Sequence, residues 1–159
     1  MRGRRAAGFH HFNCLAGGSR WAPDLGSREV AEALKRRGED FLRSARYNLS
    51  VGAYDLAVFD SHQAAELYLK GSLLNLVGTY PRTHDLTEFV EDWMAEACEE
   101  VVEEFLAEWG ERLDHLTDAY FSSRYALRSF KRRHAEVFIR VAEEVIELAK
   151  RCEEAAAEG

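Results

Sequence analysis

Residues 54–77 read YDLAVFDSHQAAELYLKGSLLNLV, and this stretch decides the fold class. Its small and apolar side chains recur every three or four positions, which is the period of a helix. Gly52 precedes the stretch, Asp55 lies at its start, and Gly78 is placed to end it. We therefore predict a long helix with one packed face. That face consists of Tyr54, Ala57, Val58, Ser61, Ala64, Ala65, Leu69, Leu73 and Leu76.

The same helical spacing continues on both sides of this stretch, from Ser27, which we expect to be an N-cap, to the end of the chain. Residues 120–131 lack it and are predicted to be a loop, and a helix break is expected near Ala97. No segment alternates apolar and polar residues as a strand does. We predict an all-α, antiparallel, up-and-down bundle of four long helices, with a fifth, short helix as an open alternative. A helix in the middle of the chain is expected to begin at Thr83 or His84.

The 159 residues suit one domain, and composition separates the first 26 residues from the rest. Residues 1–26 hold five of the eleven glycines and carry a net charge of +3, so we expect an irregular or mobile extension before a bundle domain at 27–159. No apolar run is long enough to span a membrane. The cysteines at 14, 98 and 152 lie far apart, which favours a reduced, cytoplasmic protein.

Charge is unevenly distributed along the chain, whose net charge is −7. Residues 88–118 contain twelve acidic residues and one basic residue, which is typical of the solvated face of a helix. Residues 124–134 contain five basic residues and no acid. These cations repel one another unless an anion is near. The anion is a phosphate ligand or the acidic helix of this or another chain, and the overall acidity argues against coating of nucleic acid.

A polar seam crosses the helix at 54–77, because Gln63, Glu66 and Lys70 are three and four residues apart. Two interpretations are open. The seam is a mutually satisfied contact between helices, or it is a polar cleft in which Lys70 faces an anion. His84, at the predicted helix start, is either a cap or a phosphate contact.

Two pairs in the basic segment are candidates for chemistry. Arg128 and His134 could act together on RNA, with the arginine holding a phosphate while the histidine moves a proton. A continuous helix across the six positions between them would turn the two side chains apart. Arg124 and Tyr125 lie just before and are candidates for ligand binding. We expect no metal and no cofactor, since His10, His11 and Cys14 lack further ligands and no phosphate-binding loop is present.

Three segments resemble the HEPN domain: 54–59 (YDLAVF), 63–70 (QAAELYLK) and 81–86 (PRTHDL). Ser-Arg-Tyr at 123–125 and a final amphipathic helix follow in the same order, so the resemblance covers about residues 28–152. It implies an antiparallel helical bundle that is often a homodimer and acts on nucleotides or RNA. It further implies a minimal nucleotidyltransferase partner in a toxin–antitoxin-like pair. Many members are metal-independent ribonucleases with an Arg followed by a His, a spacing that Arg128 and His134 satisfy.

These observations leave three functions open. The first is a nucleotide- or RNA-binding protein without chemistry of its own, with Gln63, Glu66, Lys70, His84, Arg124 and Tyr125 as ligand-binding residues. The second is a metal-independent ribonuclease that uses Arg128 and His134 at a dimer cleft. The third is a helical dimerisation module without a ligand. A dimer would bury the apolar residues off the main stripe of the helix at 54–77. These are Leu56, Phe59, Leu67 and Leu74.

Overall fold

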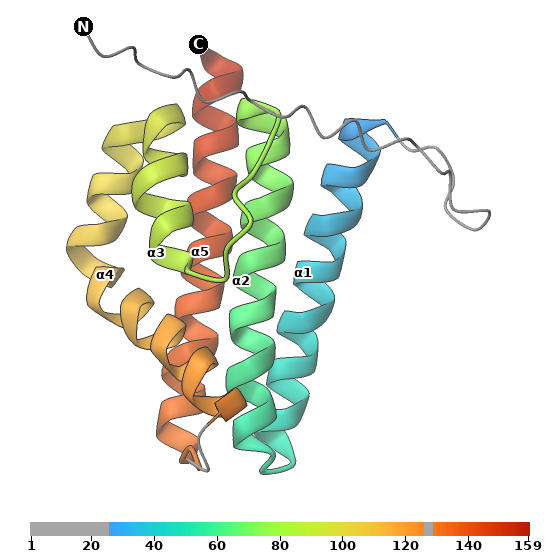
Figure 1. Cartoon of the computed structure of the whole chain (residues 1–159), viewed down its shortest axis with the longest axis vertical. Coiled ribbons are helices and arrows are strands. Elements are labelled where there is room, and N and C mark those ends of the chain that lie inside the picture. Colours follow the sequence, from blue (N-terminus) through green and yellow to red (C-terminus); the bar gives the residue numbers. More distant parts are fainter. Residues whose placement is uncertain (1–25, 126–128) are drawn as a thin grey trace, which may run out of the picture.

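The computed structural model describes residues 26–125 and 129–159. Its elements are α1 (Ser27–Ser50), α2 (Tyr54–Val77), α3 (Leu86–Glu88), the π-helical segment η1 (Phe89–Met94), α4 (Ala95–Tyr125) and α5 (Arg132–Glu158). The four long helices lie alongside one another, and α3 with η1 forms a short helical piece beside them (Figure 1). No strand occurs in the described ranges. The predicted all-α bundle of four long helices is confirmed, and the short helix that the sequence left open corresponds to α3 with η1. The predicted extension at 1–26 lies outside the described residues except for Gly26.

Helix α2 lies at the centre of the bundle and packs against α1, α4 and α5 (Figure 1). Its close approach to α1 depends on two glycines. A Cβ atom at Gly38 of α1 would lie 2.9 Å from the carbonyl oxygen of Ala64. A Cβ atom at Gly71 of α2 would lie 2.6 Å from the carbonyl oxygen of Ala31. Larger side chains at these two positions would therefore push the helices apart.

The observed end of α2 agrees with the prediction from the sequence, whereas the observed starts of α1 and α3 differ from it. Gly78 ends α2 in the left-handed conformation with φ of 80°, as its position predicted. The N-cap of α1 is Gly26 rather than Ser27, and the N-cap of α3 is Asp85 rather than Thr83 or His84. The reason at α3 is that the Asp85 carboxylate accepts a hydrogen bond from the Thr87 N–H at 2.9 Å.

Helix α4 is longer than the sequence suggested. The prediction of a loop over residues 120–131 is wrong for its first half, because α4 continues to Tyr125. Tyr120 is only 3% exposed, so burial of its ring favours continuation of the helix. The predicted break near Ala97 is confirmed one residue later, where Cys98 has non-helical angles (φ −155°, ψ 62°).

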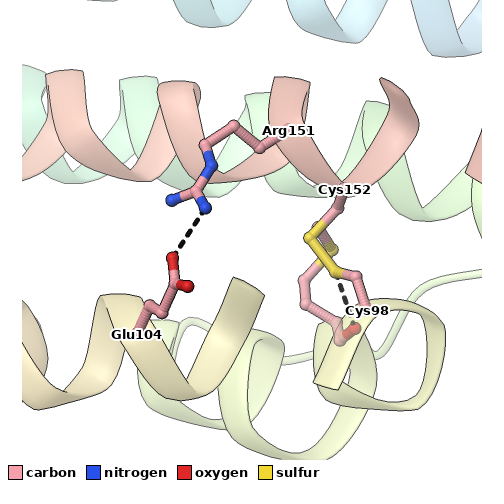
Figure 2. The surroundings of a disulfide bond; sticks show 5 residues. Cys98, Glu104, Arg151 and Cys152 are labelled. Carbon is pink, nitrogen blue, oxygen red and sulfur yellow. Dashed lines mark hydrogen bonds and ion pairs between the residues drawn. A yellow bond between two sulfur atoms is a disulfide. The ribbon is translucent and has the colours of Figure 1, made fainter. Parts of the chain in front are cut away.

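A disulfide joins Cys98, at this break, to Cys152 near the end of α5 (Figure 2). The expectation of a chain with reduced cysteines is therefore wrong for these two residues, because the fold brings segments 54 residues apart into contact. Cys14 lies outside the described residues. A cytoplasmic location stays a prediction. Within the part of the chain that the structure describes, no helix is long and apolar enough to cross a membrane.

Candidate functional site

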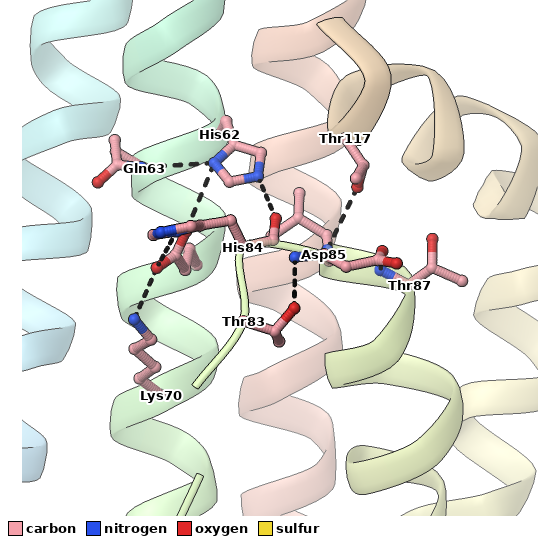
Figure 3. A network of polar contacts seen from close by, with 10 residues as sticks. His62, Gln63, Lys70, Thr83, His84, Asp85, Thr87 and Thr117 are labelled. Carbon is pink, nitrogen blue, oxygen red and sulfur yellow. Dashed lines mark hydrogen bonds and ion pairs between the residues drawn. The ribbon is translucent and has the colours of Figure 1, made fainter. Parts of the chain in front are cut away.

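The polar seam of α2 surrounds one buried carboxylate. The side chain of Glu66 is 3% exposed, and its Oε1 accepts a hydrogen bond from Lys70 Nζ at 2.6 Å. His84 Nδ1 lies 3.0 Å from the other carboxylate oxygen, so the connection between α2 and α3 is tied to α2 (Figure 3). The structure thus brings together three residues selected from the sequence. The positive charge of Lys70 therefore balances the negative charge of the buried Glu66 carboxylate.

His62 is a residue of this cluster that the sequence analysis did not select as a ligand. Its ring is fully buried, and Nε2 donates to the His84 carbonyl oxygen at 2.8 Å. Gln63 lies beside it, with its amide nitrogen 3.4 Å from His62 Nδ1 (Figure 3). Burial lowers the pKa of His62 to about 4, so the ring is neutral at pH 7.

Further hydrogen bonds hold the same connection against α4. The backbone N–H of Leu86 donates to Thr117 Oγ1 at 3.2 Å, and the Asp85 N–H donates to Thr83 Oγ1 at 3.1 Å (Figure 3). Lys70 Nζ also lies 5.6 Å from the centre of the Tyr80 ring. This cluster of His62, Glu66, Lys70 and His84, here called the α2 polar cluster, fixes the connection in place. None of its members lines the α4–α5 cavity described next.

A cavity of about 350 Å³ lies between the end of α4 and the start of α5. It is called the α4–α5 cavity below. His134, selected from the sequence, forms part of its wall. The other lining residues are His115, Asp118, Ala119, Ser122, Phe130 and Phe138.

The residues on the α4 side of this cavity were not predicted as site residues from the sequence. His115, Asp118 and Ser122 are three and four residues apart, and that spacing places them on one face of a helix. The signal was therefore present in the sequence. It was hidden because residues 120–131 were assigned to a loop, which removed Ser122 from the helix and separated it from His115.

The orientation of His134 is set by the backbone before it. The Lys131 N–H donates to His134 Nδ1 at 3.1 Å. In this arrangement the neutral imidazole carries its proton on Nε2, which makes that nitrogen a hydrogen-bond donor. The ring also meets Phe130 edge to face, with centroids 6.1 Å apart. The site thus offers a fixed polar donor beside aromatic walls.

Three predicted site residues fall at the edge of what the structure describes. Arg124 and Tyr125 belong to the last turn of α4, but their side chains lie outside the described part of the chain. Arg128 lies outside the described residues altogether. Residues 129–131 are not helical, so a continuous helix does not run back from His134 towards Arg128. The objection that a helix would turn these two side chains apart therefore does not apply.

The groups that the described residues bring together do not form a metal site, since no cluster of three or more metal-ligating side chains occurs among them. The α4–α5 cavity instead combines imidazole and hydroxyl groups with phenyl rings, a set that suits an organic ligand with both polar and flat apolar parts. Lys131, Arg132 and Arg133 come directly after Phe130, which lines the cavity, and their side chains are exposed.

Comparison with known protein families agrees with this fold. The family model for the HEPN domain matches residues 31–152, which is most of the chain and covers at least the greater part of each long helix. The match spans both the α2 polar cluster and the α4–α5 cavity. No curated protein and no solved structure matches the chain. The chain belongs to the HEPN domain family.

Proposed function

We propose that this protein binds a nucleotide, free or as part of an RNA strand, in the α4–α5 cavity. The observation that carries the proposal is that His134 lines a cavity of about 350 Å³ together with His115 and two phenyl rings. Ligand pockets usually measure about 300–1,000 Å³, so the space suits a small organic molecule. Membership of the HEPN family supports a domain related to nucleotides or RNA.

Each part of the cavity has a counterpart in a nucleotide. Phe130 and Phe138 provide apolar surface against which a base can pack. His134 Nε2 and the Ser122 hydroxyl can donate to phosphate oxygens, and Asp118 can accept from a ribose hydroxyl or a base amino group. The exposed cations at 131–133 would attract the phosphate, with an attraction that weakens as salt increases.

A titration of the full chain with fluorescent ATP and with a short single-stranded RNA tests this proposal. We expect His134→Gln to weaken binding about tenfold, since one good polar contact contributes roughly 1–1.5 kcal/mol. His84→Gln is the matched control, because His84 is exposed but lies in the α2 polar cluster. Equal loss in both variants, or no loss in His134→Gln, would contradict the assignment of the site.

A ribonuclease is the second candidate, and the pair His115 and His134 in one cavity favours it. One imidazole would take the proton of the ribose 2′-hydroxyl, and the other would protonate the leaving oxygen. The bond from the Lys131 N–H leaves His134 Nε2 as a donor, so of the two imidazoles His134 would be the proton donor and His115 the base. Incubation of the protein with a mixed RNA pool, without added metal, tests for ribonuclease activity. Cleavage that is lost in His134→Ala would show that the protein is a ribonuclease.

We propose, from the family, that the protein forms a homodimer and works with a minimal nucleotidyltransferase in a toxin–antitoxin-like pair. The predicted dimer face of α2 supports the homodimer, since Leu56 is exposed and Phe59, Leu67 and Leu74 are only half-buried. Sedimentation tests it. A species of 18 kDa alone would contradict the homodimer. A dimer that binds neither ATP nor RNA would instead favour a dimerisation module without a ligand.

A further inference from the structure

Three exposed apolar residues lie close together in sequence at one end of the bundle. Tyr47, Val51 and Leu56 are 66%, 57% and 56% exposed, and they are the three most exposed large apolar residues described. They lie within ten residues of sequence, at the turn between α1 and α2. Single exposed apolar residues are common, but a group of them marks an interaction site. We call this group the turn surface.

The turn surface adjoins a hollow of about 290 Å³. Leu56 belongs to both, and Ser129 and Phe130, just before α5, close the opposite side of the hollow. The start of α5 and the α1–α2 turn lie at the same end of the bundle (Figure 1). The remaining lining residues are Gly52, Ala53, Tyr54 and Asp55.

Backbone hydrogen bonds hold this end in one conformation. Asp55 Oδ1 accepts from the Phe130 N–H at 2.7 Å, which ties the turn to the segment before α5. Within the turn, the Ala53 N–H donates to the Asn48 carbonyl oxygen at 2.8 Å, and Gly52 supplies the positive φ of 78°. A surface that is already ordered loses little conformational entropy when a partner binds.

The charge beside the hollow is positive. Lys131, Arg132 and Arg133 directly follow Phe130 and are exposed. Arg132 reaches Glu136 at 3.8 Å and lies over the Tyr54 ring at 5.5 Å. Lys131 and Arg133 form no ion pair with any described residue. Asp55, the acid that lines the hollow, accepts the Phe130 N–H and keeps its negative charge, but Lys131 and Arg133 together outweigh it. An apolar surface flanked by unbalanced cations complements a partner that is apolar and acidic.

We propose that the turn surface binds an acidic segment of another protein, which places a large apolar side chain in the hollow beside Leu56 and its carboxylates near Lys131 and Arg133. A hollow of about 290 Å³ can receive a single peptide side chain, whereas contact with a lipid surface needs no hollow. The exposed aliphatic side chains favour a peptide over a nucleic acid, whose phosphates would meet only the cations. This inference does not depend on nucleotide binding in the α4–α5 cavity, and it requires that the homodimer proposed above leave Leu56 exposed.

Selection of short random peptides on the full chain tests the proposal. We expect the selected peptides to combine a large apolar residue with Asp or Glu. For a synthesised peptide of this kind, Val51→Ser and Lys131→Ser should each weaken binding by roughly fivefold or more, as truncation of a central contact does. Val77→Ser and Lys150→Ser are matched controls, because both residues are exposed and lie towards the other end of the bundle. Both controls should bind the peptide as the parent chain does.

Other outcomes would overturn the proposal. One is a set of selected peptides that are basic or lack an apolar residue, or that bind the Val51→Ser variant as tightly as the parent. Another is sedimentation in which Val51→Ser, but not Val77→Ser, dissociates a dimer, since the turn surface would then bind a second copy. Binding to phosphatidylserine vesicles that is lost in Lys131→Ser, without any peptide selected, would assign the surface to a membrane. ATP titration of Val51→Ser and Val77→Ser, whose residues lie outside the α4–α5 cavity, shows separately whether that cavity is intact.

Discussion

The ring of Tyr120, on α4, stacks on the ring of His62, on α2, with centroids 3.9 Å apart and planes inclined by 13°. The contact covers one face of the buried imidazole and joins two helices that are far apart in sequence. Tyr120 also lies 5.7 Å from the ring of Phe59 and 5.5 Å from the ring of His84. It therefore closes the α2 polar cluster on the side of α4 and helps to keep His62 away from water.

Stability should depend on pH through His62. The pKa of its imidazole falls from 6.5 in the unfolded chain to about 4 in the fold, mainly because of burial. Between these values the unfolded state binds more protons, so the free energy of unfolding decreases as the pH falls from 6.5 to 4. The loss amounts to about 3 kcal/mol at most. Urea denaturation of the parent and of His62→Gln across this range measures it, and parallel curves for the two proteins would refute the assignment.

The disulfide should contribute strongly to stability. A link across 54 residues lowers the entropy of the unfolded chain by an amount equivalent to about 4 kcal/mol. We expect Cys98→Ser with Cys152→Ser to lower the free energy of unfolding by up to that amount, and a reductant to lower the melting temperature of the parent only. A thiol assay that finds Cys98 and Cys152 free in the purified native protein would contradict this prediction.

The crossing of α1 and α2 makes a specific demand on Gly71. Gly71→Ala should destabilise the protein by about 2 kcal/mol, because the new Cβ atom would lie 2.6 Å from the Ala31 carbonyl oxygen. Gly110→Ala is the control inside α4, where the nearest atom is 3.7 Å away. It should stabilise the protein by about 0.5–1 kcal/mol through helix propensity. Chemical denaturation of both variants gives the comparison, and a shift in the same direction for both would count against the close approach.

Lys70 should matter for stability and not for nucleotide binding. Lys70→Met leaves the Glu66 carboxylate buried with only the imidazoles of His84 and His62 beside it, and we expect a loss of about 2 kcal/mol. The double variant with Glu66→Gln should recover part of this loss. Affinity for ATP should stay unchanged at a temperature where the variant is folded. A Lys70→Met variant that is as stable as the parent but fails to bind ATP would indicate that Lys70 belongs to the ligand-binding site.

Much of the fold could be predicted from the local pattern of residues. The apolar period of residues 54–77, the stop at Gly78 and the spacing of the other apolar stripes depend on neighbours three or four positions away. The end of α4 could not be predicted in this way. The ring of Tyr120 is buried by His62 and Phe59, which belong to another helix. Local pattern contains no information about such a contact.

The candidate site likewise contains some contacts that the local sequence pattern predicts and others that it does not. The spacing along the chain was enough to place Glu66 and Lys70 on one helical face, and their ion pair agrees with one of the two interpretations that the sequence left open. Three other groupings depend on how the helices pack: His84 joins Glu66 and Lys70, Cys98 meets Cys152, and His115 and His134 line one cavity. Each of these groupings joins residues from different helices. The packing of α2, α4 and α5 sets their distances, and packing depends on how whole helix faces fit together.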